Sequence, residues 1–171
     1  MKNLAYDKAL KLIARRDHFR GELVEKLRNK GFAADDIEGA MERLDELGLL
    51  DDEAFAERFV EFRSVDRGWG PHRLANELRR RGVDSDVAER VSRLDEELHS
   101  RALETAVRRV LVRAKNGWWR LPERRARLVK SLIARGFTTD VAYGAIGRAA
   151  DERERSDDEI TDQPGDSGRL S

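Results

Sequence analysis

The sequence predicts an all-α protein of three tandem three-helix repeats, joined in an elongated arrangement that allows curvature and followed by a disordered acidic tail. Alanine, leucine, glutamate and arginine dominate the chain, and only 3 of the 171 residues are proline, which favours helix. One helix-ending phrase recurs three times at a nearly constant interval, which is typical of a repeat protein. The chain has no cysteine and no apolar run of transmembrane length, so we expect a cytoplasmic protein without disulfides or a membrane segment.

The recurring phrase consists of a leucine pair, a glycine and an apolar residue, and its copies read LVEKLRNKGF, LANELRRRGV and LVKSLIARGF. Leucines four residues apart lie on one face of a helix. Gly31, Gly82 and Gly136 follow each pair, where a left-handed glycine can close the helix. Such a cap brings the next apolar residue onto the second leucine, as for Phe32 on Leu27. The glycines are 51 and 54 residues apart, which leaves room for three helices of average length and their turns.

A new helix is expected to begin after each glycine. Asp35, Ser85 and Thr139 are suitable N-cap residues, and each precedes an aspartate that favours the positive end of the helix dipole. The apolar stripes of these helices are expected to be Ile37, Met41 and Leu44, then Val87, Val91 and Leu94, and then a weaker stripe of Val141, Ala145 and Arg148.

The remaining helix of each repeat lies upstream of the phrase. Asp51 and Asp52 are cap candidates for the second repeat, and Asp17 is one for the phrase helix of the first. Pro71 and Pro122 mark the starts of the other two phrase helices. The apolar residues of the upstream helices are Leu4, Ala5, Ala9, Leu12 and Ile13; Phe55, Phe59 and Phe62; and Leu103, Val107, Val110, Leu111 and Ala114. We therefore divide the chain into repeat 1 (1–50), repeat 2 (51–98), repeat 3 (99–150) and an acidic tail (151–171).

Charge is segregated along the chain although the formal net charge is zero. Residues 99–150 carry 12 basic and 3 acidic side chains, whereas residues 151–171 carry 3 basic and 8 acidic ones. A coding bias toward arginine would leave the arginines beside acidic partners, and repeat 3 has lost those partners. We expect the acidic tail to fold back and screen the basic repeat.

Repeat 3 supplies the candidate surface for a partner. Arg101, Arg108 and Lys115 are seven residues apart and would line one helix face, and Arg109 and Arg113 would form a second row. Arginine pairs well with phosphate or carboxylate, so the partner could be DNA, an acidic protein surface or both. The alternative is that these side chains are only solvated. The full candidate set is Arg101, Arg108, Arg109, Arg113, Lys115, Arg124, Arg125, Arg127 and Lys130, with Arg79, Arg80 and Arg81 as a second basic spot whose members could instead pair with nearby aspartates.

The sequence gives no sign of catalysis. His18, His72 and His99 are isolated and lack metal-ligand spacing, and no phosphate-binding loop of the ATPase type is present. Asp51 and Asp52 are better explained as a helix cap than as a metal site. We expect no catalytic residue, metal or cofactor. Packing in the interhelical loops is the preferred interpretation of Trp69, Trp118 and Trp119, with base stacking as the alternative.

Three segments resemble the RecX regulatory proteins of bacteria: YDKALKLIARRDHFRGELVEKLRNKGF, LGLLDDEAFAERFVEFR and GWGPHRLANELRRRGVD. The resemblance covers about residues 5–150 and is strongest in the middle. It implies a fold of three tandem three-helix repeats, which agrees with the division above. Phe19 departs from the family pattern, since a serine cap is common at that place. Repeat 3 matches more loosely, and the acidic tail is not part of the shared pattern.

The resemblance also implies a function. RecX proteins bind the RecA recombinase, mainly as its filament on single-stranded DNA, and lower its ATPase and strand-exchange activity, so the role would lie in DNA recombination, DNA repair and the SOS response. We expect a monomer that contacts the RecA filament and that could also contact single- or double-stranded DNA. The residues alone leave two alternatives open: a nucleic-acid-binding repeat protein acting through basic repeat 3, and a structural adaptor for an unrelated partner. The zero net charge argues against a dedicated DNA binder.

Overall fold

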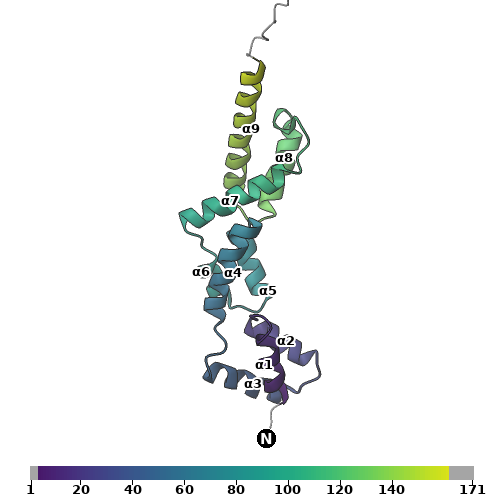
Figure 1. Ribbon diagram of the computed structural model, residues 1–171, viewed down its shortest axis with the longest axis vertical. Helices are drawn as coiled ribbons and strands as arrows, with labels where there is room; N and C mark the ends of the chain where they lie inside the picture. Colours follow the sequence, from purple (N-terminus) through teal and green to yellow (C-terminus); the bar gives the residue numbers. More distant parts are fainter. Residues whose placement is uncertain (1–3, 162–171) are drawn as a thin grey trace, which may run out of the picture.

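The computed structural model describes residues 4–161, with the side chains of residues 4–158. Within that range every regular element is helical, and the order is α1 (Leu4–Ile13), α2 (Arg20–Arg28), α3 (Ala34–Glu46), α4 (Asp52–Arg67), α5 (Pro71–Arg80), α6 (Ser85–Val91), α7 (Glu96–Leu111), the short 3₁₀ helix η1 (Trp118–Arg120), α8 (Pro122–Ile133) and α9 (Thr139–Thr161). The groups α1–α3, α4–α6 and α7–α9 follow one another along the long axis of the molecule (Figure 1). The predicted all-α fold of three tandem three-helix repeats in an elongated arrangement is confirmed.

All three phrase helices end with the same pair of backbone hydrogen bonds. In repeat 1 the Phe32 N–H donates to the Leu27 carbonyl at 3.3 Å, and the Gly31 N–H donates to the Arg28 carbonyl at 2.9 Å. The pair recurs at Gly82 and at Gly136, and the three glycines have φ angles of 84°, 86° and 94°. These are left-handed caps of the Schellman type, so the predicted helix ends are confirmed.

The glycine turns also join each repeat to the one before it. A Cβ at Gly82 would lie 3.0 Å from the Cα of Gly21 in α2, and a Cβ at Gly136 would lie 2.8 Å from the carbonyl oxygen of Gly70. Gly31, in the first of the three repeats, has open space at the same place. The turn that closes one phrase helix therefore docks against the start of the preceding phrase helix, and only glycine allows so close an approach.

The N-caps after the glycines differ from the prediction. Each helix begins earlier than expected, because the residue two places after the glycine takes the cap position: Ala33 before α3, Asp84 before α6 and Thr138 before α9. The Asp84 side chain accepts from the N–H groups of Asp86 and Val87 at 2.8 and 3.3 Å. Ala33 has no side chain that can cap, so α3 begins without such a bond. The predicted caps Asp35, Ser85 and Thr139 are wrong.

Other helix starts agree with the sequence, with one exception. Asp51 caps α4 by accepting from the Ala54 N–H at 2.9 Å, and Pro71 and Pro122 each open their helix. The predicted cap Asp17 is wrong, because Phe19 holds the N-cap position of α2. A carboxylate from the next repeat serves α2 instead, since the Arg20 N–H donates to Oδ1 of Asp52 at 2.8 Å.

Phe19 joins repeat 1 to the core of repeat 2. Its side chain is fully buried and packs with Phe55 and Phe59, at ring-centroid distances of 4.4 and 6.0 Å. The hydrophobic cluster that contains Phe19 is otherwise formed by repeat 2 and includes Leu74 and Leu78. An aromatic side chain is therefore used here for inter-repeat packing, where a serine would only cap a helix.

Repeats 2 and 3 meet where α4 packs against α7. Gly68 closes α4 with a φ of 62°, and a Cβ on it would lie 2.6 Å from the backbone nitrogen of Ala106 in α7. The Gly70 N–H donates to the Arg135 carbonyl at 2.7 Å, and the His72 N–H donates to the Gly136 carbonyl at 3.2 Å. This junction is therefore formed by backbone contacts as well as by side chains.

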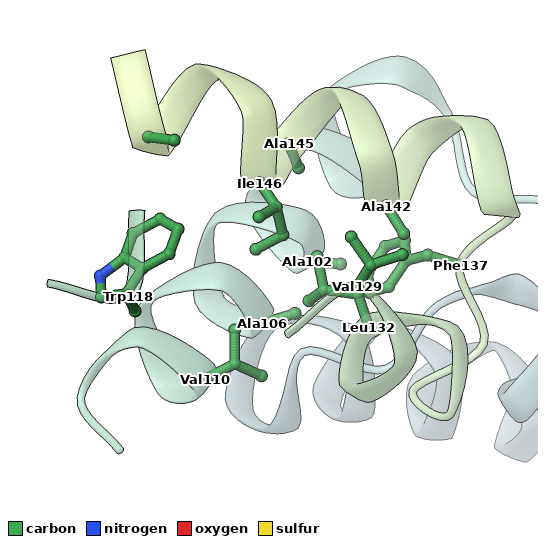
Figure 2. Close-up of a cluster of buried hydrophobic side chains, with 11 residues drawn as sticks. Ala102, Ala106, Val110, Trp118, Val129, Leu132, Phe137, Ala142, Ala145 and Ile146 are labelled. Carbon is green, nitrogen blue, oxygen red and sulfur yellow. The ribbon is translucent and has the colours of Figure 1, made fainter. Parts of the chain in front are cut away.

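The core of repeat 3 differs from the prediction in its last helix. Trp118, Val129 and Leu132 pack with the α9 residues Ala142 and Ile146 (Figure 2). Of the predicted stripe Val141, Ala145 and Arg148, only Ala145 is buried. The buried face of α9 is formed by Ala142, Ala145, Ile146 and Ala150. Small alanines allow α9 to lie close to α7 and α8.

The predicted start of a disordered tail at residue 151 is corrected by the structure. Helix α9 continues without a break to Thr161 and projects along the long axis (Figure 1). The segment that follows Ala150 lacks an apolar stripe, but it extends a helix that the buried alanines already anchor, so no new nucleation is needed. Residues 162–171 lie outside the described residues. None of the helices between residues 4 and 161 is both long and apolar enough to cross a membrane.

Gly31 and Gly136 form a matched pair that tests the stacking role of the glycine turns. Both have a left-handed backbone, so alanine at either costs about 1–2 kcal/mol of free energy of unfolding. Gly136→Ala also forces a Cβ into the Gly70 and Arg73 backbone, which should add about 1–3 kcal/mol. Chemical denaturation measures both losses. Equal losses for the two variants would mean that the turn in repeat 3 does not carry the junction.

Candidate functional site

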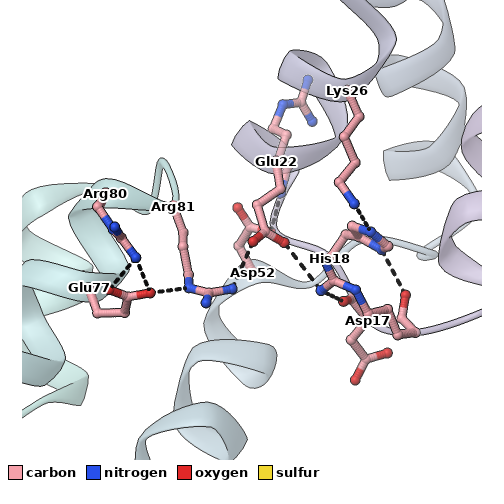
Figure 3. Close-up of polar contacts among 10 residues, drawn as sticks. Asp17, His18, Glu22, Lys26, Asp52, Glu77, Arg80 and Arg81 are labelled. Atoms are coloured by element: carbon pink, nitrogen blue, oxygen red, sulfur yellow. Dashed lines mark hydrogen bonds and ion pairs between the residues drawn. The ribbon is translucent and has the colours of Figure 1, made fainter. Parts of the chain in front are cut away.

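The second predicted basic spot belongs to a structural network at the junction of repeats 1 and 2 (Figure 3). Arg80 and Arg81 both donate to Glu77, at 2.9 and 3.0 Å, and Arg79 pairs with Glu89 at 2.5 Å. Burial raises the pKa of Glu77, but the hydrogen bonds from Arg80 and Arg81 outweigh it and hold that pKa below its usual value. Arg81 also bridges to Glu22 of α2 at 2.7 Å. The positive charges of this spot are therefore compensated within the molecule.

His18 is buried at the same junction and is held in its neutral form. Its Nδ1 lies 2.8 Å from the Arg16 carbonyl and its Nε2 lies 2.9 Å from the Lys26 ammonium. Because an ammonium can only donate, Nε2 accepts and the Nδ1–H donates to the carbonyl. Burial lowers the pKa of His18 below its ordinary value of 6.5, and the charges of Arg16 and Lys26 act in the same direction.

The neutral His18 makes stability depend on pH. The unfolded chain binds a proton at His18 more tightly than the folded chain does, so the free energy of unfolding falls as the pH drops through 6.5. His18→Gln removes that titration. Urea denaturation at pH 7.5 and pH 5.5 should show a larger loss for the wild-type protein than for His18→Gln. The same loss in both proteins would show that His18 is not the titrating group.

Five arginines from repeats 2 and 3 line one groove. Arg73 comes from α5, Arg109 from α7, Arg127 from α8, Arg113 from just after α7 and Arg135 from just after α8. The lining is completed by Trp69, Val110, Leu128, Ser131 and Ala134. No carboxylate lines this groove, and within the side chains of residues 4–158 none of the five guanidinium groups forms an ion pair.

Backbone carbonyls hold three of these arginines. Arg109 donates to the Asp66 carbonyl at 2.6 Å, Arg135 to the Arg67 carbonyl at 2.9 Å and Arg73 to the Ala134 carbonyl at 3.3 Å. Each of these bonds crosses between repeats 2 and 3. A carbonyl orients a guanidinium without cancelling its charge. The three arginine side chains are therefore held in place, and the groove remains strongly positive.

Arg135 reports the electrostatic character of the groove. Burial lowers its pKa, and the neighbouring charges of Arg109, Arg73 and Arg113 lower it further. A guanidinium remains protonated under all physiological conditions. The lowered pKa therefore means that the positive charges of these arginines repel one another in the folded protein. A bound anion would relieve that repulsion, which makes this groove the candidate functional site.

The sequence placed three of the five groove arginines on the candidate surface and missed two. Arg109, Arg113 and Arg127 lie together as expected, although α7 ends at Leu111, before Arg113. Arg73 was missed because it belongs to repeat 2, which has an excess of acidic residues. Arg135 was missed because it precedes the phrase glycine and looks like an ordinary helix-end residue. Three arginines in repeat 3 without nearby acidic partners were the signal that did exist.

The other predicted residues of repeat 3 are dispersed. Arg101 and Arg108 line a second groove, between α4 and α7, with Arg58 and the exposed Phe62; Arg109 lines both grooves. Lys115 does not share a helix face with them, because α7 ends at Leu111, so that part of the prediction is wrong. Arg124 donates to the Asn116 carbonyl at 3.0 Å, and Lys130 is exposed on α8.

Acidic residues of α9 compensate two further arginines. Arg125 pairs with Glu154 at 2.7 Å and also donates to the Trp119 carbonyl, and Arg120 pairs with Asp157 at 2.9 Å. The acidic segment therefore reaches the basic repeat as the continuation of α9. Neither Arg120 nor Arg125 lines the arginine groove, so these pairs lie outside it.

Tryptophan packing follows the preferred interpretation. Trp118 is buried in the core of repeat 3, and Trp119 packs edge-on against it at 6.1 Å between ring centroids. Trp69 lies in the loop before α5, edge-on to Phe59 at 6.3 Å, and the Arg73 guanidinium sits 4.4 Å from its ring centroid.

Stacked three-helix units with a charged groove at one junction define a helical repeat protein that presents an extended surface. Family models for RecX match this chain in two places: the first three-helix domain at residues 5–44 and the second three-helix domain at residues 51–91. The regulatory protein RecX of Halorhodospira halophila is 38% identical over 152 residues, which cover 87% of this chain and 90% of that protein. The corresponding protein of Mycolicibacterium smegmatis is 36% identical over 152 residues, covering 85% and 80%.

A solved structure agrees with these sequence matches. The crystal structure of RecX from Lactobacillus salivarius has a TM-score of 0.70 and 24% sequence identity, and the match covers 86% of this chain and 95% of that one. The chain belongs to the RecX family of regulatory proteins.

Proposed function

We propose that this chain binds the RecA recombinase as its filament on single-stranded DNA and lowers the ATPase and strand-exchange activity of that filament. The observation that carries the proposal is the 38% identity to a regulatory protein RecX across nearly the full length of both chains. The protein would act in the cytoplasm as a monomer, in recombination, DNA repair and the SOS response. It would act by binding rather than by catalysing a reaction.

The shape of the molecule supports this proposal. Three repeats follow one another along one axis and give the molecule a long surface (Figure 1). A partner that repeats along its own axis, as a filament does, can contact such a surface at several places at once. The candidate contacts are the basic residues of repeat 3, with the arginine groove as the most strongly charged part.

The proposal predicts inhibition of ATP hydrolysis by RecA on single-stranded DNA at substoichiometric amounts of this chain. Changing Arg108, Arg109, Arg113, Arg124 and Arg127 together to glutamate should raise the concentration needed for half-inhibition at least about tenfold, because favourable charge contacts become repulsive. Circular dichroism checks that the variant keeps its helix content. The control changes Lys11, Arg15, Arg28 and Lys30 to glutamate; these residues are exposed in repeat 1, outside the candidate contacts, and this variant should change inhibition much less.

Two results would count against the proposal in different ways. If an excess of free single-stranded DNA abolishes the inhibition completely, the chain acts by sequestering DNA and does not bind the filament. If the five-arginine variant inhibits as well as the wild-type protein, the basic surface of repeat 3 takes no part in the contact.

A further inference from the structure

We propose that the arginine groove between repeats 2 and 3 is a binding site for the phosphodiester backbone of a nucleic-acid strand. This inference deepens the proposed function and rests on it for biological context, since it assigns DNA phosphate, and not a carboxylate surface of the recombinase, to this part of the contact. Five arginines line this groove, and no carboxylate does.

The charge of the groove is fixed by the fold. Arg73, Arg109 and Arg135 are oriented by carbonyls across the junction, and none of them is paired with a carboxylate among the described side chains. The nearby Asp66 carboxylate is already paired with Arg67 at 2.7 Å. Arg113 and Arg127 make no hydrogen bond or ion pair through their guanidinium groups to any side chain or backbone that the structure describes, so their forks are available to a ligand.

A polyanion fits five clustered guanidiniums better than a protein surface does. A nucleic-acid strand carries one negative charge per nucleotide with no compensating cations of its own, and binding releases condensed counterions. Carboxylates on a protein are usually interspersed with lysine and arginine, so few surfaces offer several unpaired ones together. The planar fork of arginine also matches a phosphate with two hydrogen bonds.

The groove should bind the phosphate backbone of the strand and make no specific contact with its bases. Its aromatic residue, Trp69, is covered, because the guanidinium groups of Arg73 and Arg63 lie over the ring at 4.4 and 5.3 Å from its centroid. These two contacts compete with a base for the face of the ring. Binding would therefore be independent of sequence and steeply dependent on salt.

The site requires both repeats, which distinguishes it from a simple basic repeat 3. Arg73 belongs to α5 of repeat 2, and the other four arginines belong to repeat 3. A bound strand would contact both units at once and stabilise their junction in the folded state by mass action.

Matched double variants test the site in the full-length protein without any recombinase. The probe is a fluorescent single-stranded oligonucleotide of about 20 thymidines, with binding measured by anisotropy across a salt series. Arg113→Gln with Arg127→Gln should weaken binding about tenfold and reduce the slope of log affinity against log salt by about 1.4, since roughly 0.7 is lost per phosphate contact. Lys11→Gln with Lys30→Gln removes the same charge from exposed positions in repeat 1, outside the groove and outside the candidate contacts, and should weaken binding less than about threefold.

Arg73→Gln tests the contribution of repeat 2. This substitution should weaken binding by about the same factor as the substitution of one groove arginine in repeat 3. We expect this even though acidic residues outnumber basic ones in repeat 2. Duplex DNA and inorganic phosphate in parallel titrations show whether a strand, a duplex or an isolated phosphate is preferred. Binding of the oligonucleotide with the predicted losses supports the site.

Three outcomes would overturn the inference: equal losses for the groove and control variants, an Arg73→Gln variant with wild-type affinity, or displacement of the oligonucleotide by a poly-glutamate peptide at equal charge concentration. None of these outcomes bears on the proposed function, which is tested by measuring ATP hydrolysis by the recombinase filament. Conversely, a protein that binds the oligonucleotide through the groove but leaves filament ATPase unchanged would overturn the proposed function and leave this site standing.

Discussion

The close approach of glycine-containing turns between neighbouring repeats is the contact on which the rest of the structure depends. Gly136 meets the Gly70 backbone so closely that a Cβ on either residue would collide with the other turn. The same contact joins Gly82 to Gly21 one repeat earlier. Because each glycine ends its own helix and docks on the previous one, a single residue sets both the local turn and the direction in which the repeats stack.

The stacking also determines where charge gathers. At the junction of repeats 1 and 2, arginines meet glutamates, and the result is a compensated network with Phe19 packed beside it. At the junction of repeats 2 and 3, arginines meet backbone carbonyls, and the charge stays open to a ligand. Two structurally similar junctions therefore differ in chemistry. The neutral total charge of the chain hides this difference, because the acidic residues lie elsewhere in the molecule.

The features that follow from local chemistry could be predicted from the sequence, and those that depend on a neighbouring repeat could not. The leucine pairs and Gly31, Gly82 and Gly136 identified three helix ends correctly, because the cap needs only residues close in sequence. The starts of the three helices that follow these glycines were misplaced. The cap position lies two residues after the glycine, and in repeat 1 it is occupied by Ala33, which is not a capping residue type. Phe19 and Arg73 take their roles from contacts across a junction. Helix α9 continued because buried alanines upstream anchor it.

Native-state hydrogen exchange at the amides of Gly70 and His72 tests the stacked arrangement most directly. First-turn amides of a helix have no acceptor within that helix, so protection here can come only from the Arg135 and Gly136 carbonyls, at 2.7 and 3.2 Å in the next repeat. Stacked repeats predict that both amides exchange as slowly as the helical interior of α5. Exchange at the rate of an exposed loop would contradict the junction and, with it, the groove that the junction forms.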